Sequence, residues 1–115
     1  MKYTLKERKK LYDDATTYWG KPAQYDQFIE ESCELIVAIN KFKRKSFYGE
    51  YKNDESIEEN LIEELADTYM CLEQLIDFSG KEKVFNKLDE KLDKLKMQIE
   101  KQKERKNKKY KIKNN

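Results

Sequence analysis

The segment 23–43 reads AQYDQFIEESCELIVAINKFK, and apolar side chains recur along it at steps of three or four residues. Such spacing places side chains along one face of an α-helix. The stripe, which has one small polar member, consists of Tyr25, Phe28, Ile29, Ser32, Ile36 and Ile39. Pro22 precedes the segment, and proline is favoured in the first turn of a helix. The pattern therefore predicts a helix over residues 23–43.

The same spacing predicts three more helices, over residues 5–18, 56–79 and 81–103. Gly20 and Gly80 are placed to end the helices before them. Ser56 followed by Glu59 is typical of a capping box at a helix start. Residues 44–54 lack periodicity and are predicted to form a loop. The last helix carries a coiled-coil-like seam of Phe85, Leu88, Leu92, Leu95 and Ile99.

These elements predict an all-α fold that resembles a four-helix bundle. We expect one helical domain over residues 1–103. The lysine- and asparagine-rich residues 104–115 are predicted to be a basic, disordered tail.

Composition narrows the possible chemistry. Charged residues make up 42% of the chain and hydrophobic residues 37%, with one proline, three glycines and no histidine. The scarcity of helix breakers agrees with an all-helical fold. The absence of histidine excludes the usual zinc sites and the Ser-His-Asp triad. Catalysis would therefore depend on carboxylates, lysines, tyrosines or a bound ion.

Charge is unevenly distributed along the chain. Residues 1–100 carry 17 Lys/Arg against 22 Asp/Glu, whereas residues 101–115 carry eight Lys/Arg against one acid. Basic tails bind phosphate backbones, but an acidic body repels nucleic acid, so nucleic acid is not the expected partner.

The sequence also suggests where the protein resides. It contains no apolar run of membrane-spanning length and does not begin like a signal peptide. Its two cysteines, Cys33 and Cys71, are expected to be buried reduced thiols. We therefore expect a cytoplasmic protein without membrane contact.

Two acidic pairs stand out because they lie in apolar surroundings. Glu31 and Glu34 lie within FIEESCELI, and Glu64 and Asp67 lie within LIEELAD. Each pair has i, i+3 spacing, which puts both carboxylates on one helix face. Carboxylates beside an apolar core are costly to keep ionised unless a positive group binds them. Four such groups on facing helices would form an all-oxygen site suited to Mg²⁺ or Mn²⁺. Alternatively, they are ordinary surface acids that flank the apolar stripes.

Here the sequence resembles a known family. The pattern Glu30-Glu31-x-x-Glu34 followed by Glu64-x-x-Asp67 resembles the signature of the all-alpha nucleoside triphosphate pyrophosphohydrolases, the MazG-like superfamily. Trp19-Gly20, Gln24, EESCELI and EELADTY occur in the family's order and at about its spacing. The similarity covers about residues 18–96 and implies the all-α fold of that family.

The resemblance implies a role for each matching residue. Glu31, Glu34, Glu64 and Asp67 would bind the metal, and Glu30 would orient or deprotonate the attacking water. Lys91 and Lys94 would neutralise phosphate oxygens, although Lys94 stands where better-known members have arginine. Trp19 would stack on the base or pack in a core or subunit contact. Gln24 would hydrogen-bond a base edge or face solvent.

The resemblance implies hydrolysis of an NTP or dNTP to the monophosphate and pyrophosphate. One alternative is a relative of the phosphoribosyl-ATP pyrophosphohydrolases, which usually carry a histidine where this chain has Tyr69-Met70-Cys71. Another is a helical interaction protein without enzymatic activity, in which the acids only maintain solubility.

The apolar stripes predict self-association. Three helices each carry a stripe that needs a facing partner, and a single chain of this size would leave one apolar surface uncovered. Symmetric pairing would cover it, so we expect a homodimer or homotetramer. The family resemblance implies the same.

Overall fold

The computed structural model describes residues 1–114, and these residues contain four helices and no β-strand. They are α1 (Leu5–Trp19), α2 (Lys21–Tyr48), α3 (Ser56–Ser79) and α4 (Lys81–Asn114). The all-α class predicted from the sequence is thus confirmed. No helix within these residues is both long and apolar enough to cross a membrane.

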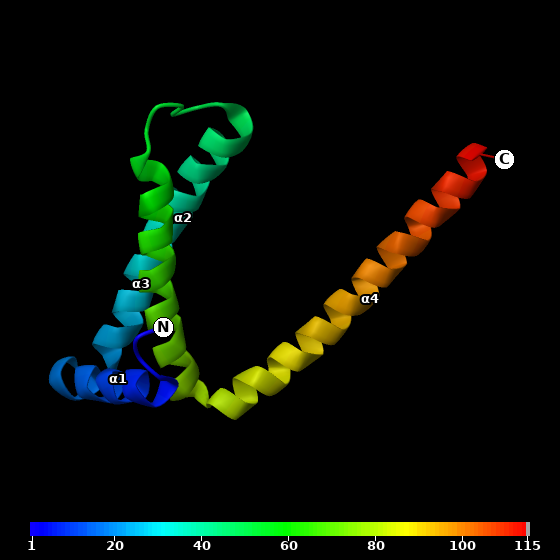
Figure 1. Cartoon of the computed structure of the whole chain (residues 1–115). Helices are drawn as coiled ribbons and strands as arrows, with labels where there is room; N and C mark the ends of the chain where they lie inside the picture. The colour runs from blue at the N-terminus through cyan, green and yellow to red at the C-terminus, as the bar shows by residue number, and fades with distance from the viewer. Residues whose placement is uncertain (115) are drawn as a thin grey trace. The chain divides into compact units, whose positions relative to one another are not determined.

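The contacts divide the chain into two units, Met1–Phe78 and a second unit that begins at Ser79. In the first unit, α2 and α3 form an antiparallel hairpin, and α1 lies across the end of the hairpin opposite its connecting loop (Figure 1). The second unit is the single helix α4.

The hairpin is held together by a heptad-like seam. Side chains that are buried or half-buried recur along both helices at alternating steps of three and four, which is the spacing of a coiled-coil contact. On α2 they are Gln24, Phe28, Glu31, Leu35, Ala38, Phe42 and Lys45, and on α3 they are Ile57, Leu61, Glu64, Thr68, Cys71, Leu75 and Phe78. The seam therefore includes glutamates at two positions where an apolar side chain would be usual.

A second apolar stripe on each hairpin helix is exposed within the first unit. Ile29 and Ile36 on α2 are 62% and 66% exposed, and Leu65 and Leu72 on α3 are 48% and 42% exposed. The stripe predicted over residues 23–43 contained Ile29 and Ile36, whereas the buried seam includes positions such as Ala38, which the periodicity did not single out. Each helix thus has two apolar faces, of which the hairpin covers one.

The buried core is correspondingly small. Its buried apolar members among the described residues are Tyr12, Ala38, Ile57 and Cys71. Burial of Cys71 confirms the prediction for that thiol, but the prediction for Cys33 is wrong because its side chain is exposed. Cys33 lies outside the seam, on a part of α2 that the hairpin does not cover.

The helix ends differ from prediction in two places. α2 continues through residues 44–48 and ends at Gly49, whose φ of 71° is the left-handed conformation that favours glycine. The predicted capping box at Ser56 is wrong, because the Ser56 hydroxyl and amide both donate to the Asp54 carboxylate. A capping box does form at the start of α1, between Thr4 and Glu7.

Helix α4 is longer than the sequence predicted. It continues past Lys103 to Asn114, and no side chain along it is buried in its own unit. The predicted seam residues from Phe85 to Ile99 are about half exposed. The domain division at residues 103/104 stays a prediction, and its final residue, 115, lies outside the described residues.

Candidate metal site

Three glutamates converge in the hairpin seam. Glu31 and Glu34 project from α2 and Glu64 from α3, and one carboxylate oxygen from each lies within 4.8 Å of the other two. Glu31 and Glu64 meet because both occupy seam positions on facing helices. Glu34 joins them because it lies one turn after Glu31 on the same side of α2. The hydrogen bond from the Thr68 hydroxyl to the Glu31 carbonyl, at 3.3 Å, joins the two helices beside this cluster.

Two oxygens of this carboxylate cluster have no donor. Glu31 Oε1 accepts a hydrogen bond from Gln27 Nε2 at 2.8 Å. Glu31 Oε2 and Glu64 Oε2 are buried and have no hydrogen-bond partner in the described part of the chain. Buried polar atoms are normally satisfied, so two orphaned acceptors at one point call for a positively charged or donating group.

Burial and the neighbouring carboxylates raise the pKa values of Glu31 and Glu64. Burial, then the negative charges of Glu34, Glu31 and Asp67, raise the pKa of Glu64 to about 7. Burial, followed by the charges of Glu34 and Asp67, also raises the pKa of Glu31. None of the ion pairs within residues 1–114 involves a member of the cluster. The protein therefore supplies no cation to balance this site.

The donor set fits a hard divalent cation. All three side chains offer carboxylate oxygens, and such ligands suit Mg²⁺ or Mn²⁺ better than zinc. The orphaned oxygens of Glu31 and Glu64 are the atoms that an ion would satisfy. Ion binding would also remove the repulsion that raises the pKa of Glu64.

The remaining acidic residues singled out from the sequence lie beside the cluster. Asp67 is half-buried on α3 and is not one of the three convergent ligands, but its charge raises the pKa values of both Glu31 and Glu64. Glu30 is exposed on α2, next to Glu31 in sequence but outside the seam.

The two residues proposed to contact a base differ in exposure. Trp19 is 72% exposed at the end of α1. Gln24 is buried, and its Oε1 accepts a hydrogen bond at 3.0 Å from Nε2 of Gln74, which is also buried. Gln24 thus neither faces solvent nor presents a free amide in this state. The pairing of Gln74 with Gln24 could not be predicted, because the apolar stripes do not relate these two positions.

The proposed phosphate-binding residues lie in the other unit. Lys91 and Lys94 are both exposed on α4. Their contribution to substrate binding stays a prediction.

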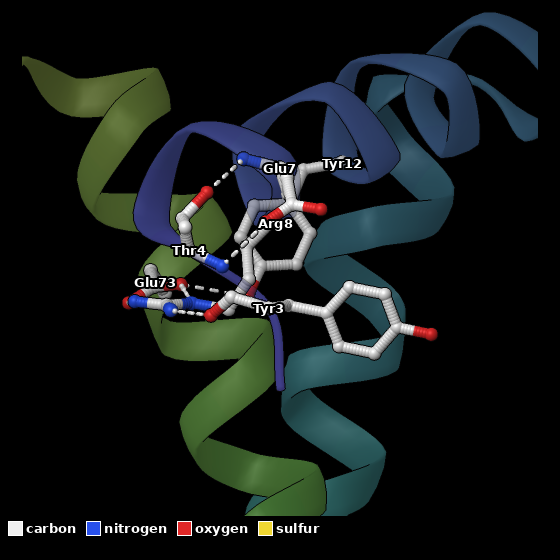
Figure 2. Close-up of polar contacts among 6 residues, drawn as sticks. All are labelled: Tyr3, Thr4, Glu7, Arg8, Tyr12 and Glu73. Carbon is white, nitrogen blue, oxygen red and sulfur yellow. Dashed lines mark hydrogen bonds and ion pairs between the residues drawn. The ribbon is translucent and has the colours of Figure 1, made fainter. Parts of the chain in front are cut away.

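A polar network that the sequence did not reveal joins α1 to α3 (Figure 2). Arg8 Nε and Nη2 donate to the two carboxylate oxygens of Glu73 at 2.7 and 3.2 Å, and the Tyr12 hydroxyl donates to the same carboxylate at 2.8 Å. Arg8 Nη1 also donates to the Tyr3 carbonyl at 2.9 Å. These bonds, led by Arg8, lower the pKa of Glu73 to about 2. The network fixes α1 against α3.

Comparison of the chain with protein-family models, with curated proteins and with solved structures yields no match.

Proposed function

We propose that the chain is a Mg²⁺-dependent nucleotide pyrophosphohydrolase that converts an NTP or dNTP to the monophosphate and pyrophosphate, with Mn²⁺ as a possible substitute ion. The observation that supports this most is the convergence of Glu31, Glu34 and Glu64, two of which carry a buried oxygen without a donor. The proposed reaction class comes from the acidic motifs, which resemble the signature of the MazG-like superfamily.

Three carboxylates alone would repel an anionic substrate, so a cation between them and the phosphates is required on electrostatic grounds. When bound, such an ion stabilises negative charge on phosphoryl oxygens and lowers the pKa of a bound water. Glu31, Glu34 and Glu64 would hold it, and Asp67 would add negative charge beside them. Glu30, exposed next to Glu31, is the residue proposed to orient or deprotonate the attacking water.

The substrate contacts rest on the resemblance. Lys91 and Lys94 would bind phosphate oxygens, and Trp19 offers an exposed aromatic face for a base. Gln24 would contact a base edge only after release from Gln74, so in the described state it acts as a positioning residue for the hairpin.

The exposed second stripes of α2 and α3 favour a homodimer or homotetramer. A soluble protein rarely leaves a contiguous apolar face of this kind in water, and a second copy of the hairpin would present a matching surface.

The first test is metal binding measured by thermal unfolding. An ion present at ten times its Kd stabilises the folded state by about 1.4 kcal/mol, which raises the Tm by roughly 5 °C for a domain of this size. Glu34→Gln should lose this rise. Glu63→Gln, which removes the same charge from an exposed position on α3 outside the cluster, should keep it. An absent Mg²⁺ or Mn²⁺ effect in the wild type, or an equal one in Glu34→Gln, would contradict the metal site.

The second test is release of pyrophosphate from a panel of deoxy- and ribonucleoside triphosphates with Mg²⁺. Glu34→Gln should reduce the rate by at least tenfold, while Glu63→Gln should leave it within about twofold. Metal binding without activity on any member would leave the ion site intact but refute the proposed reaction.

A helical interaction protein is the second candidate, and the exposed apolar faces of the hairpin favour it. Unlike the proposed enzyme, an interaction protein would self-associate without any effect of Mg²⁺ on its melting curve. A phosphoribosyl-ATP pyrophosphohydrolase is a weaker candidate, because Tyr69-Met70-Cys71 stands where that group usually has histidine.

A further inference from the structure

The C-terminal part of α4 is a dense array of positive charge. Residues 101–113, hereafter the basic segment, are helical and exposed. They contain eight cations and one acid, Glu104. Thirteen helical residues rise about 20 Å at 1.5 Å each. The basic segment thus carries one cation per about 2.4 Å, against one phosphate per about 1.7 Å in duplex DNA.

Several of these cations share one side of the helix. Lys101, Arg105, Lys108 and Lys109 have the spacing i, i+4, i+7 and i+8, which defines a single face. None of them takes part in an ion pair within residues 1–114. Like charges at i, i+4, such as Lys101 and Arg105, weaken a helix by about 0.2–0.5 kcal/mol per pair. A polyanion would remove this repulsion, so binding and helix formation would support each other.

We propose that the basic segment is an interface for the phosphate backbone of nucleic acid and binds it without regard to base sequence. Lysine and arginine contacts to phosphates supply affinity but no base recognition. A membrane surface is disfavoured because an interfacial helix needs an apolar face. The only large apolar side chains of the basic segment, Tyr110 and Ile112, are two residues apart and so point to nearly opposite sides.

The acidic body does not oppose this assignment. Residues 1–78 carry 17 acids and 11 Lys/Arg, whereas residues 79–114 carry six acids and 14 Lys/Arg. The two stretches belong to separate compact units. Release of counterions from phosphates is a local effect that depends on the cations in contact with them. On the sequence alone the net charge of residues 1–100 argued against nucleic acid. The extension of α4 through residues 104–114 instead makes the basic segment a continuous binding surface.

Fluorescence anisotropy of a labelled 20-base-pair duplex, titrated with the full chain, tests the proposal. If the four cations of the shared face contact phosphates, log K should fall with log[salt] with a slope of about −3.6. Affinity should then drop about 10²-fold between 50 and 200 mM KCl. Duplexes of unrelated sequence should bind within about twofold of each other. No binding at 50 mM KCl, or a slope near zero, would overturn the proposal.

Matched variants locate the interface. Replacing Lys101, Arg105 and Lys108 together with Gln should weaken binding at least tenfold and flatten the salt slope. The same charge change at Lys83, Lys87 and Lys96, earlier on α4, should weaken binding less than threefold. Glutamine has nearly the helix propensity of lysine, and circular dichroism should confirm equal helicity. An equal loss of duplex affinity in the two variants would refute a nucleic-acid interface. So would a protein that stays bound to phosphatidylserine vesicles at 200 mM KCl, where it releases the duplex.

Discussion

Loss of the ion pair between Arg8 and Glu73 should destabilise the first unit strongly. Their side chains are 18% and 13% exposed, and Arg8 contributes two of the three side-chain hydrogen bonds that Glu73 accepts. Arg8→Met keeps much of the side-chain volume but leaves the carboxylate with Tyr12 alone. Breaking a pair of this kind is destabilising because the remaining charge has lost its partner.

The magnitude follows from the pKa of Glu73. Its fall from 4.5 to about 2 corresponds to about 3 kcal/mol of preferential binding to the ionised form. Partial exposure and salt screening reduce the expected effect to about 2 kcal/mol. For a unit of this size, that loss lowers the Tm by roughly 8–10 °C. The comparison is Lys10→Met, which removes an exposed i, i+4 pair with Asp14 and should cost about 0.5 kcal/mol or less.

The stabilisation by the Arg8–Glu73 pair should depend on pH in a direction set by the lowered pKa of Glu73. Because the folded-state pKa of Glu73 lies below the unfolded value, its stabilisation is complete above about pH 4.5 and disappears as the pH falls towards 2. Urea unfolding of the wild type and Arg8→Met at pH 7, 4, 3 and 2 should therefore show a difference that shrinks in acid. An Arg8→Met loss no larger than that of Lys10→Met, or a difference that persists unchanged to pH 2, would refute the reasoning.

Three further outcomes are expected. Because the pKa of Glu64 is raised to about 7, the metal-free protein should lose stability as the pH rises from about 4.5 to 7. In Glu64→Gln, the free energy of unfolding in urea should change less over this pH range. Gln74→Ala should cost about 1–3 kcal/mol because it leaves Oε1 of the buried Gln24 without a donor, whereas replacing both glutamines with Leu should recover most of the loss in the same assay. Light scattering should give a dimer or tetramer mass, which a double change of Leu65 and Leu72 to Lys should reduce to the monomer. A wild-type monomer at micromolar concentration would contradict the assembly.

The number and type of helices could be predicted from the sequence because strong three–four periodicity and few breakers leave little choice. The end of α2 was placed too early, although no breaker occurs between Arg44 and Gly49. The same rule that located the helix ends at Gly20 and Gly80 would have placed this one correctly. α4 passes Lys103 for the same reason, since no glycine or proline follows it.

The face that each helix buries could not be predicted reliably. Both apolar stripes of α2 satisfy the helical spacing, so periodicity cannot distinguish the seam around Ala38 from the exposed row around Ile36. The apolar surroundings of Glu31 and Glu64 did indicate two carboxylates near the core. The contact between Arg8 and Glu73 had no local signal, since these residues are 65 positions apart in the sequence.

The buried amide pair of Gln24 and Gln74 has an evolutionary consequence. In a seam with heptad spacing, one helix can shift by seven residues along the other and present the same spacing again. Such a shift moves the helix by about 10 Å. The same shift would separate Gln24 from Gln74 and Glu31 from Glu64. The glutamine pair thus favours the register that brings the carboxylates together. Insertions or deletions in the loop between Gly49 and Glu55 should therefore leave the carboxylate cluster intact during evolution, as long as both glutamines are retained.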